Sequence, residues 1–178
     1  MKIFKQALAV FVCALGCAAC TPSLNWREVR FDDGGVVVLL PCKPDKAQRQ
    51  IALENNGQAV SAQLTLQGCE ASDIQFTWGQ ISIPPSMDAK RVMAAWRLAS
   101  LSALGVEPQE ASVQNESVGA PQKGVIALRT QVQTHQHDSQ LLWFANAGYV
   151  YQLAVYGAPK DKSFDDVAHV YFSGVKLP

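Results

Sequence analysis

The sequence predicts an α+β domain in which an antiparallel sheet of about eight to nine strands has two main helices packed on one side. Stretches with the period-two alternation of half-buried strands far outnumber stretches with helical periodicity. The strands follow one another through short turns such as Asn55-Asn56-Gly57, which indicate hairpins and not the long crossovers of parallel strands. The 178 residues are 48% hydrophobic and 17% charged, which is the composition of one globular domain.

Residues 1–19 have the pattern of an export signal. Lys2 and Lys5 precede an apolar run over residues 7–15, and small residues follow it. This run is too short to cross a bilayer as a helix. We therefore expect the segment to be removed on export, and residues 23–178 to form a single periplasmic domain.

Two cysteines, Cys17 and Cys20, close the export signal, each after small or apolar residues. This arrangement resembles the lipobox of bacterial lipoproteins, which implies that one of the two is lipidated and begins the mature chain. Cys17 is the first candidate, because Ala14 stands where that family prefers an aliphatic residue. Cys20 is the alternative, since it would leave an even number of cysteines behind it. Neither cysteine is followed by aspartate, which by the same resemblance favours the outer membrane, facing the periplasm.

The first strands surround the most apolar run of the mature chain. Alternation predicts a strand over residues 25–31, a turn at 32–35, and a buried strand over 36–40, which is apolar without alternation. Later strands are expected at residues 46–54, 58–67, 74–83, 123–133, 141–145, 149–157 and 172–177. The polar segment 106–121 predicts a loop, with room for a short strand at 111–118.

Two segments have the features of helices. Ser86 is the expected N-cap of the first, which carries one apolar stripe as far as Leu104 and has Gly105 as its C′ residue. The second begins at Ser163, because residues 163–166 resemble a capping box, and it continues through Tyr171.

Cys42 and Cys69 are the cysteines that remain in the predicted domain. Each ends a predicted strand, and the hairpin between them would bring those strand ends together. Since exported proteins mature in an oxidising compartment, we expect a disulfide between the two. The alternative is a pair of buried thiols.

Two groups of residues are candidate sites, although the common catalytic motifs are absent and the sequence predicts neither an enzyme nor a cofactor. His135 and His137 would lie on one side of a strand, where Asp138 could complete a metal site; the alternative is a polar hairpin tip. An aromatic ligand cleft between sheet and helix is the second candidate, with the core as the alternative location for its residues. The residues of this predicted cleft are Trp78, Trp96, Trp143 and Tyr151.

Three segments together resemble a known group of proteins: FDDGGVVVLLPCKP, GYVYQLAVYG and KSFDDVAHVYFSGVKL. They are similar to segments of small bacterial lipoproteins and periplasmic domains of unknown function whose fold is PsbP-like. The resemblance covers roughly residues 25–177 and implies a curved antiparallel sheet with helices packed on it. Members of this fold serve mainly as binding or assembly partners, and the shared positions carry no functional residues across.

Charge and composition limit the classes of partner that the domain is expected to bind. Without Lys2 and Lys5 the domain has 13 basic and 15 acidic residues, with no basic block, so nucleic acid is not an expected partner. We expect a non-catalytic binding or assembly module, held at the membrane by its N-terminal lipid, with an unidentified envelope protein or ligand as partner. The alternative is a periplasmic protein that binds a small ligand or metal through the aromatic cleft or His135 and His137.

Overall fold

The computed structural model describes residues 24–30, 35–118 and 125–178. The predicted export signal, Cys17 and Cys20 lie outside these residues, as does most of the predicted turn at 32–35. Among the described residues, no helix has the length and apolar character needed to cross a membrane.

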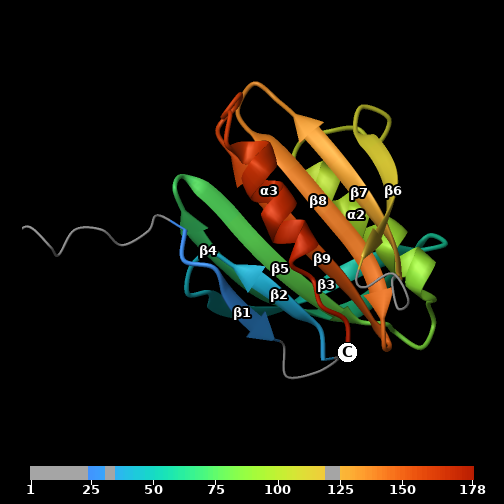
Figure 1. Cartoon of the computed structure of the whole chain (residues 1–178). Coiled ribbons are helices and arrows are strands. Elements are labelled where there is room, and N and C mark those ends of the chain that lie inside the picture. The colour runs from blue at the N-terminus through green and yellow to red at the C-terminus, as the bar shows by residue number, and fades with distance from the viewer. Residues whose placement is uncertain (1–23, 31–34, 119–124) are drawn as a thin grey trace, which may run out of the picture.

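Nine strands occur in the described residues, and each pairs antiparallel with its neighbours. Two of them, β1 (Arg27–Arg30) and β2 (Val37–Leu40), form a small separate sheet, and seven form a main sheet in the order β3-β4-β5-β9-β8-β7-β6 (Figure 1). The strands of the main sheet are β3 (Asp45–Asn55), β4 (Gln58–Ala71), β5 (Ile74–Ser82), β6 (Ser112–Val118), β7 (Val125–Gln133), β8 (Asp138–Asn146) and β9 (Tyr149–Gly157). The α+β class and the large antiparallel sheet are thereby confirmed.

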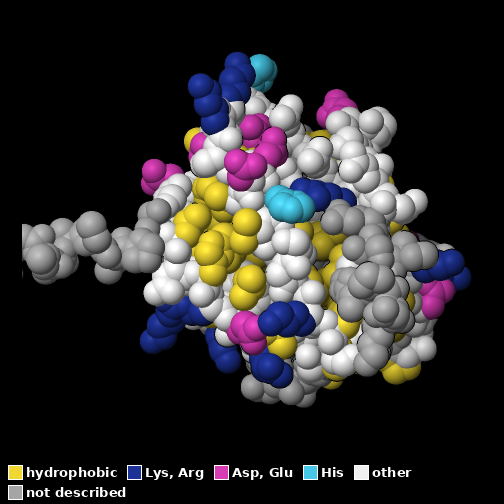
Figure 2. All heavy atoms as spheres, in the orientation of Figure 1, with side chains coloured by type: hydrophobic (Ala, Val, Ile, Leu, Met, Phe, Trp, Pro, Cys, Tyr) yellow, Lys and Arg dark blue, Asp and Glu magenta, His cyan; other side chains and the backbone are white. Residues whose placement is uncertain are grey.

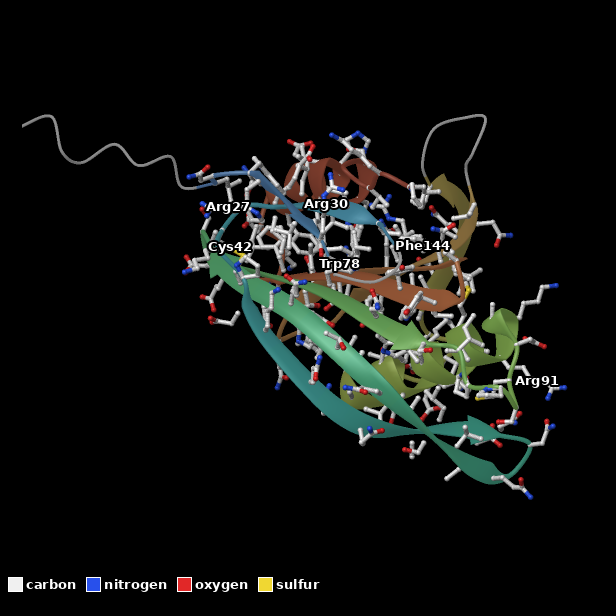
Figure 3. All side chains as sticks on the ribbon, turned by 90° about the horizontal axis from the view of Figure 1, so that it is seen from below. Arg27, Arg30, Cys42, Trp78, Arg91 and Phe144 are labelled. Carbon is white, nitrogen blue, oxygen red and sulfur yellow. A yellow bond between two sulfur atoms is a disulfide. The ribbon has the colours of Figure 1, made fainter. Side chains whose placement is uncertain are left out.

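The two helices, α2 (Ala89–Ala103) and α3 (Phe164–Ser173), cover opposite faces of the main sheet (Figures 1 and 3). Side chains of α3 pack in one buried cluster with Trp78 of β5, and side chains of α2 pack in another with Trp143 of β8. The prediction that both helices lie on one side is therefore wrong. The central strands explain why: every residue of β8 from Ser139 to Phe144 is buried, and a sheet with two apolar faces needs cover on both.

The β1–β2 pair completes the cover on the α3 side. Val36, Val38 and Leu40 have no exposed surface, which confirms the predicted burial of this run, although β2 packs over the main sheet and does not join it. The described chain from residue 24 onward thus contains the sheet, the cover of both faces and the two large core clusters.

The strand predicted at 172–177 does not form. Helix α3 continues to Ser173 because Phe164, Ala168, Tyr171 and Phe172 keep the helical spacing of buried residues. Beyond the helix, Lys176 makes a single bridge to Val37, with N···O distances of 3.0 and 2.9 Å. The end of the chain is therefore fastened to β2 by two hydrogen bonds and not by a strand.

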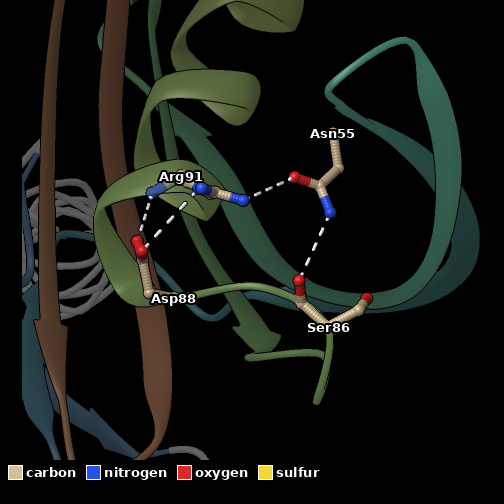
Figure 4. A network of polar contacts seen from close by, with 4 residues as sticks. All are labelled: Asn55, Ser86, Asp88 and Arg91. Atoms are coloured by element: carbon tan, nitrogen blue, oxygen red, sulfur yellow. Dashed lines mark hydrogen bonds and ion pairs between the residues drawn. The ribbon is translucent and has the colours of Figure 1, made fainter.

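The start of α2 also differs from its prediction, because Asp88 and not Ser86 is the N-cap. The Asp88 carboxylate accepts a hydrogen bond from the Arg91 backbone N–H at 2.9 Å (Figure 4). Asn55, at the tip of the β3–β4 hairpin, donates to the Ser86 carbonyl and accepts from the Arg91 guanidinium, both at 3.3 Å. This network fixes the hairpin tip against the first turn of the helix.

We expect Asp88→Ala to lower the free energy of unfolding by about 1 kcal/mol, because a backbone N–H of the first turn loses its acceptor. Ser86→Ala is the matched control. Only the backbone carbonyl of Ser86 takes part in the network, so this change should stay within about 0.5 kcal/mol of the parent. Urea unfolding of both variants measures the difference; equal losses in the two would contradict the assignment of the cap.

At the start of α3 the predicted capping box is absent. The Ser163 side chain makes no capping bond to the helix; its hydroxyl and its backbone N–H both donate to Oδ1 of Asp161 at 2.9 Å. The hydrogen bonds from Ser163 hold the pKa of Asp161 below its ordinary value. Asp165 and Asp166 in the first turn complement the helix dipole instead.

Candidate functional site

A groove of about 530 Å³ lies between the C-terminal half of α2 and the main sheet, and we call it the α2 groove. Its volume is within the range of small-molecule sites. Its lining residues are Arg49, Ile51, Ala52, Leu64, Leu66, Gln75, Trp96, Ala99, Ser100, Ala103, Leu104, His137, Gln152 and Tyr156. They come from the edge strand β3, from β4, β5 and β9, from α2, and from the turn before β8.

The groove exists because the side chains of α2 change in size along the helix. Val92 and Trp96 are large and pack onto the sheet, whereas Ala99 and Ala103, one turn apart, are too short to reach it. Trp96 approaches closely because it lies over Gly79, where an added Cβ would be 2.9 Å from the indole ring. Trp96 thus sets the height of the helix above the sheet, and the small side chains of Ala99 and Ala103 leave the space open.

Three polar side chains enter this apolar surface from the sheet side. Gln152 on β9 donates a hydrogen bond from Nε2 to Oγ of Ser100 on α2, at 2.8 Å, and so ties the wall to the floor. Burial raises the pKa of the Tyr156 phenol, and a hydrogen bond with the Thr77 side chain partly opposes this rise. The Nε2 atom of His137 is buried without a hydrogen-bond partner in the part of the chain that the structure describes.

Among the described residues, the groove has positive and no negative charge. They contribute the guanidinium of Arg49 to its lining and no carboxylate. Arg49 is exposed on β3, and within residues 24–30, 35–118 and 125–178 it makes no hydrogen bond or ion pair. A ligand with a negative group would meet a cation at this end of the groove without displacing an existing partner.

A second hollow, of about 430 Å³, lies on the other face of the sheet beside the N-terminal end of α3. It is polar, and His135, Asp138 and Gln140 contribute to its lining. Gln140 donates to Asp165 at 2.7 Å, and the Lys160 backbone N–H donates to Asp138 at 2.9 Å. Figure 2 shows carboxylates gathered at this end of α3. The lining carboxylates Asp138, Asp161 and Asp165 each accept a hydrogen bond from within the protein.

The structure does not bring His135, His137 and Asp138 together. His135 and Asp138 line the hollow beside α3, whereas His137 lines the α2 groove on the opposite face. The two histidines lie in a turn, where Oγ1 of Thr134 accepts the N–H of His137 at 3.0 Å, so the alternation of a strand does not apply to them. Among the described residues no three His, Cys, Asp or Glu side chains are placed to hold a metal ion.

The four aromatic residues of the predicted cleft are divided between the faces of the sheet. Trp78 and Tyr151 have no exposed surface and pack on the α3 side, with ring centroids 6.5 Å apart. Trp143 is equally buried on the α2 side, and Trp96 alone lines the α2 groove. The cleft prediction is therefore wrong for three of the four, because alternate residues of a strand face opposite layers.

The sequence interpretation missed most of the residues that line the groove. Arg49 lay in the strand predicted at 46–54 and Gln152 in the strand predicted at 149–157, and neither was assigned a binding role. The available indication was the run of small residues at Ala99, Ser100 and Ala103 in an otherwise bulky helical stripe. Such a run indicates either close packing or open space, and only the distance between helix and sheet decides which.

Comparisons with known proteins give a limited result. No family model matches the chain, and no curated protein matches it. Among solved structures, the chain is similar to the solution structure of cyanobacterial PsbP (CyanoP) from Synechocystis sp. PCC 6803, at 12% sequence identity and a TM-score of 0.48. The match covers 92% of this chain and 98% of that chain.

Proposed function

We propose that the protein is a membrane-anchored lipoprotein of the bacterial cell envelope that acts as a non-catalytic binding module and holds its ligand in the α2 groove. The groove carries the proposal: it combines an apolar floor and wall with a few polar groups, the usual composition of a ligand site. The buried Nε2 of His137 adds a hydrogen-bonding atom that the described residues leave unused. The PsbP-like assignment, with its curved sheet, belongs to the same proposal and rests on the three sequence segments quoted above.

The tether between a lipidated cysteine and the described residues would be short. Leu24, the first described residue, follows Cys17 by seven positions and Cys20 by four. Since an extended chain spans at most about 3.6 Å per residue, a lipidated cysteine would hold Leu24 within about 25 Å of the bilayer surface. Figure 2 shows a hydrophobic patch beside the point where the described chain begins. Anchored there, the protein would turn its α3 side to the membrane and the α2 groove away from it.

The intact mass of the mature protein, purified from its own membranes, tests the anchor. An acylated chain that begins at Cys17 or Cys20 is the expected result, with a gain of two hydrogens on reduction if the disulfide is intact. A mass without lipid, or one that still includes residues 1–16, would contradict the anchor and the orientation that depends on it.

Binding of a neutral apolar dye, N-phenyl-1-naphthylamine, tests the groove in the chain from residue 24 to 178. We expect saturable binding that Ala103→Phe weakens at least tenfold, because a benzyl group would fill the space beneath α2. Ala94→Phe is the control, since Ala94 is exposed on α2 and does not line the groove. Equal binding by both variants, or no saturable binding by the parent, would contradict a ligand site in the groove.

A further inference from the structure

We infer that the ligand of the α2 groove is an anionic amphiphile, a molecule with an alkyl chain and a single carboxylate group, and that Arg49 binds the carboxylate. This inference rests on the proposed function, because it names the class of ligand for that same groove. It follows from the charge of the lining, the position of the cation, and the distribution of apolar side chains along the groove.

The charge of the lining selects the sign of the ligand. A guanidinium pairs well with a carboxylate, and Arg49 faces the groove from the edge strand without an internal partner among the described residues. No described Asp or Glu lines the groove, so an anion meets no repulsion from the described residues. A cationic ligand would face Arg49 with no compensating carboxylate, so the groove disfavours it.

The position of Arg49 places the charged group at the open end. Arg49 is exposed on β3, where a carboxylate can bind it and still keep part of its hydration. The strand order β3-β4-β5-β9-β8 puts His137, which precedes β8, at the other end of the groove. A molecule that contacts both Arg49 and His137 would have to extend across several strands, as an elongated chain can.

The part of the groove next to Arg49 is apolar, whereas Gln75, Gln152 and Tyr156 lie toward the end at His137. Next to Arg49, the floor consists of Ile51, Leu64 and Leu66, and the wall consists of Ala99 and Ala103. An alkyl chain laid along this surface would exclude water from both faces, at roughly 25 cal/mol for each Å² of apolar area removed from water. A purely polar anion would leave this surface wet, so the groove favours an amphiphile over a small hydrophilic acid.

Displacement of the bound dye from the 24–178 chain by dodecanoate and by 1-dodecanol, below their aggregation limits, tests the inference. We expect dodecanoate to bind up to about fivefold more tightly than dodecanol, since an ion pair with an exposed guanidinium contributes up to about 1 kcal/mol. Arg49→Gln should remove this preference by weakening dodecanoate more than dodecanol. Lys46→Gln is the matched control, because Lys46 is a cation on the same strand that does not line the groove. Raising the salt concentration should weaken dodecanoate alone.

The outcomes separate the inference from the proposed function. If dodecanoate and dodecanol bind with equal affinity, and Arg49→Gln changes neither affinity, the ligand is not an anionic amphiphile. The groove would then be a purely apolar site. The assignment of Arg49 would be overturned if Lys46→Gln removed the preference for dodecanoate and Arg49→Gln did not. If neither compound displaces the dye and Ala103→Phe has no effect on the dye, the binding function of the groove itself is wrong.

Discussion

Removal of the Cys42–Cys69 disulfide is expected to lower the free energy of unfolding by about 3.5 kcal/mol. The two cysteines are 27 residues apart in the chain, and a loop of this length loses that much conformational entropy in the unfolded state when it is closed. The bond also joins the small sheet to the main one, since Cys42 follows β2 and Cys69 lies in β4. Its loss should therefore loosen the β1–β2 cover on the α3 side first.

Urea unfolding of Cys42→Ala/Cys69→Ala, beside the oxidised and the reduced parent, measures this effect. The reduced parent and the double variant should unfold at similar urea concentrations, because both lack the cross-link and alanine is only one sulfur atom smaller than cysteine. A difference of less than about 1 kcal/mol between oxidised and reduced parent would show that the bond contributes little to stability.

Short-range patterns accounted for the hairpins and for the cysteine pair. The sequence Asn55-Asn56-Gly57 predicts a turn between β3 and β4, and Asn56 and Gly57 have the positive φ values, 53° and 81°, that such a turn requires. The turn between β4 and β5 has positive φ at Ser72 and Asp73, residues that give a weaker indication, and β4 runs on to Ala71, beyond its predicted end. These hairpins are sufficient to predict that Cys42 and Cys69 lie close together.

The distribution of the elements over the two faces of the sheet could not be predicted in the same way. Alternation along β5 separates Trp78 from Gly79, but it does not say which helix will cover which side. The α2 groove depends on the same missing information, because Ala99 and Ala103 fit a buried stripe as well as an open wall. Their role follows from Trp96 and Gly79, residues far apart in sequence whose contact sets the height of α2.

Truncation of the buried Trp78 side chain is expected to destabilise the protein more than any other single substitution proposed above. Trp78 has no exposed surface, and it packs in the cluster that joins β5 to α3 (Figure 3). Trp78→Ala should lower the free energy of unfolding by about 3–5 kcal/mol, because it removes a large apolar surface and leaves a cavity. Leu98→Ala is the control at a side chain that is 46% exposed, and it should change stability by less than about 0.5 kcal/mol.

The same position also tests the division of the core into two faces. Trp78→Phe keeps an aromatic ring and is expected to stay folded, so its affinity for the dye in the α2 groove can be measured. Because Trp78 lies on the α3 side, this affinity should equal that of the parent, whereas Trp96→Phe should change it, since Trp96 lines the groove. If Trp78→Phe weakened the dye as much as Trp96→Phe does, the two indoles would share one site, and the separation of the core clusters by the sheet would be wrong.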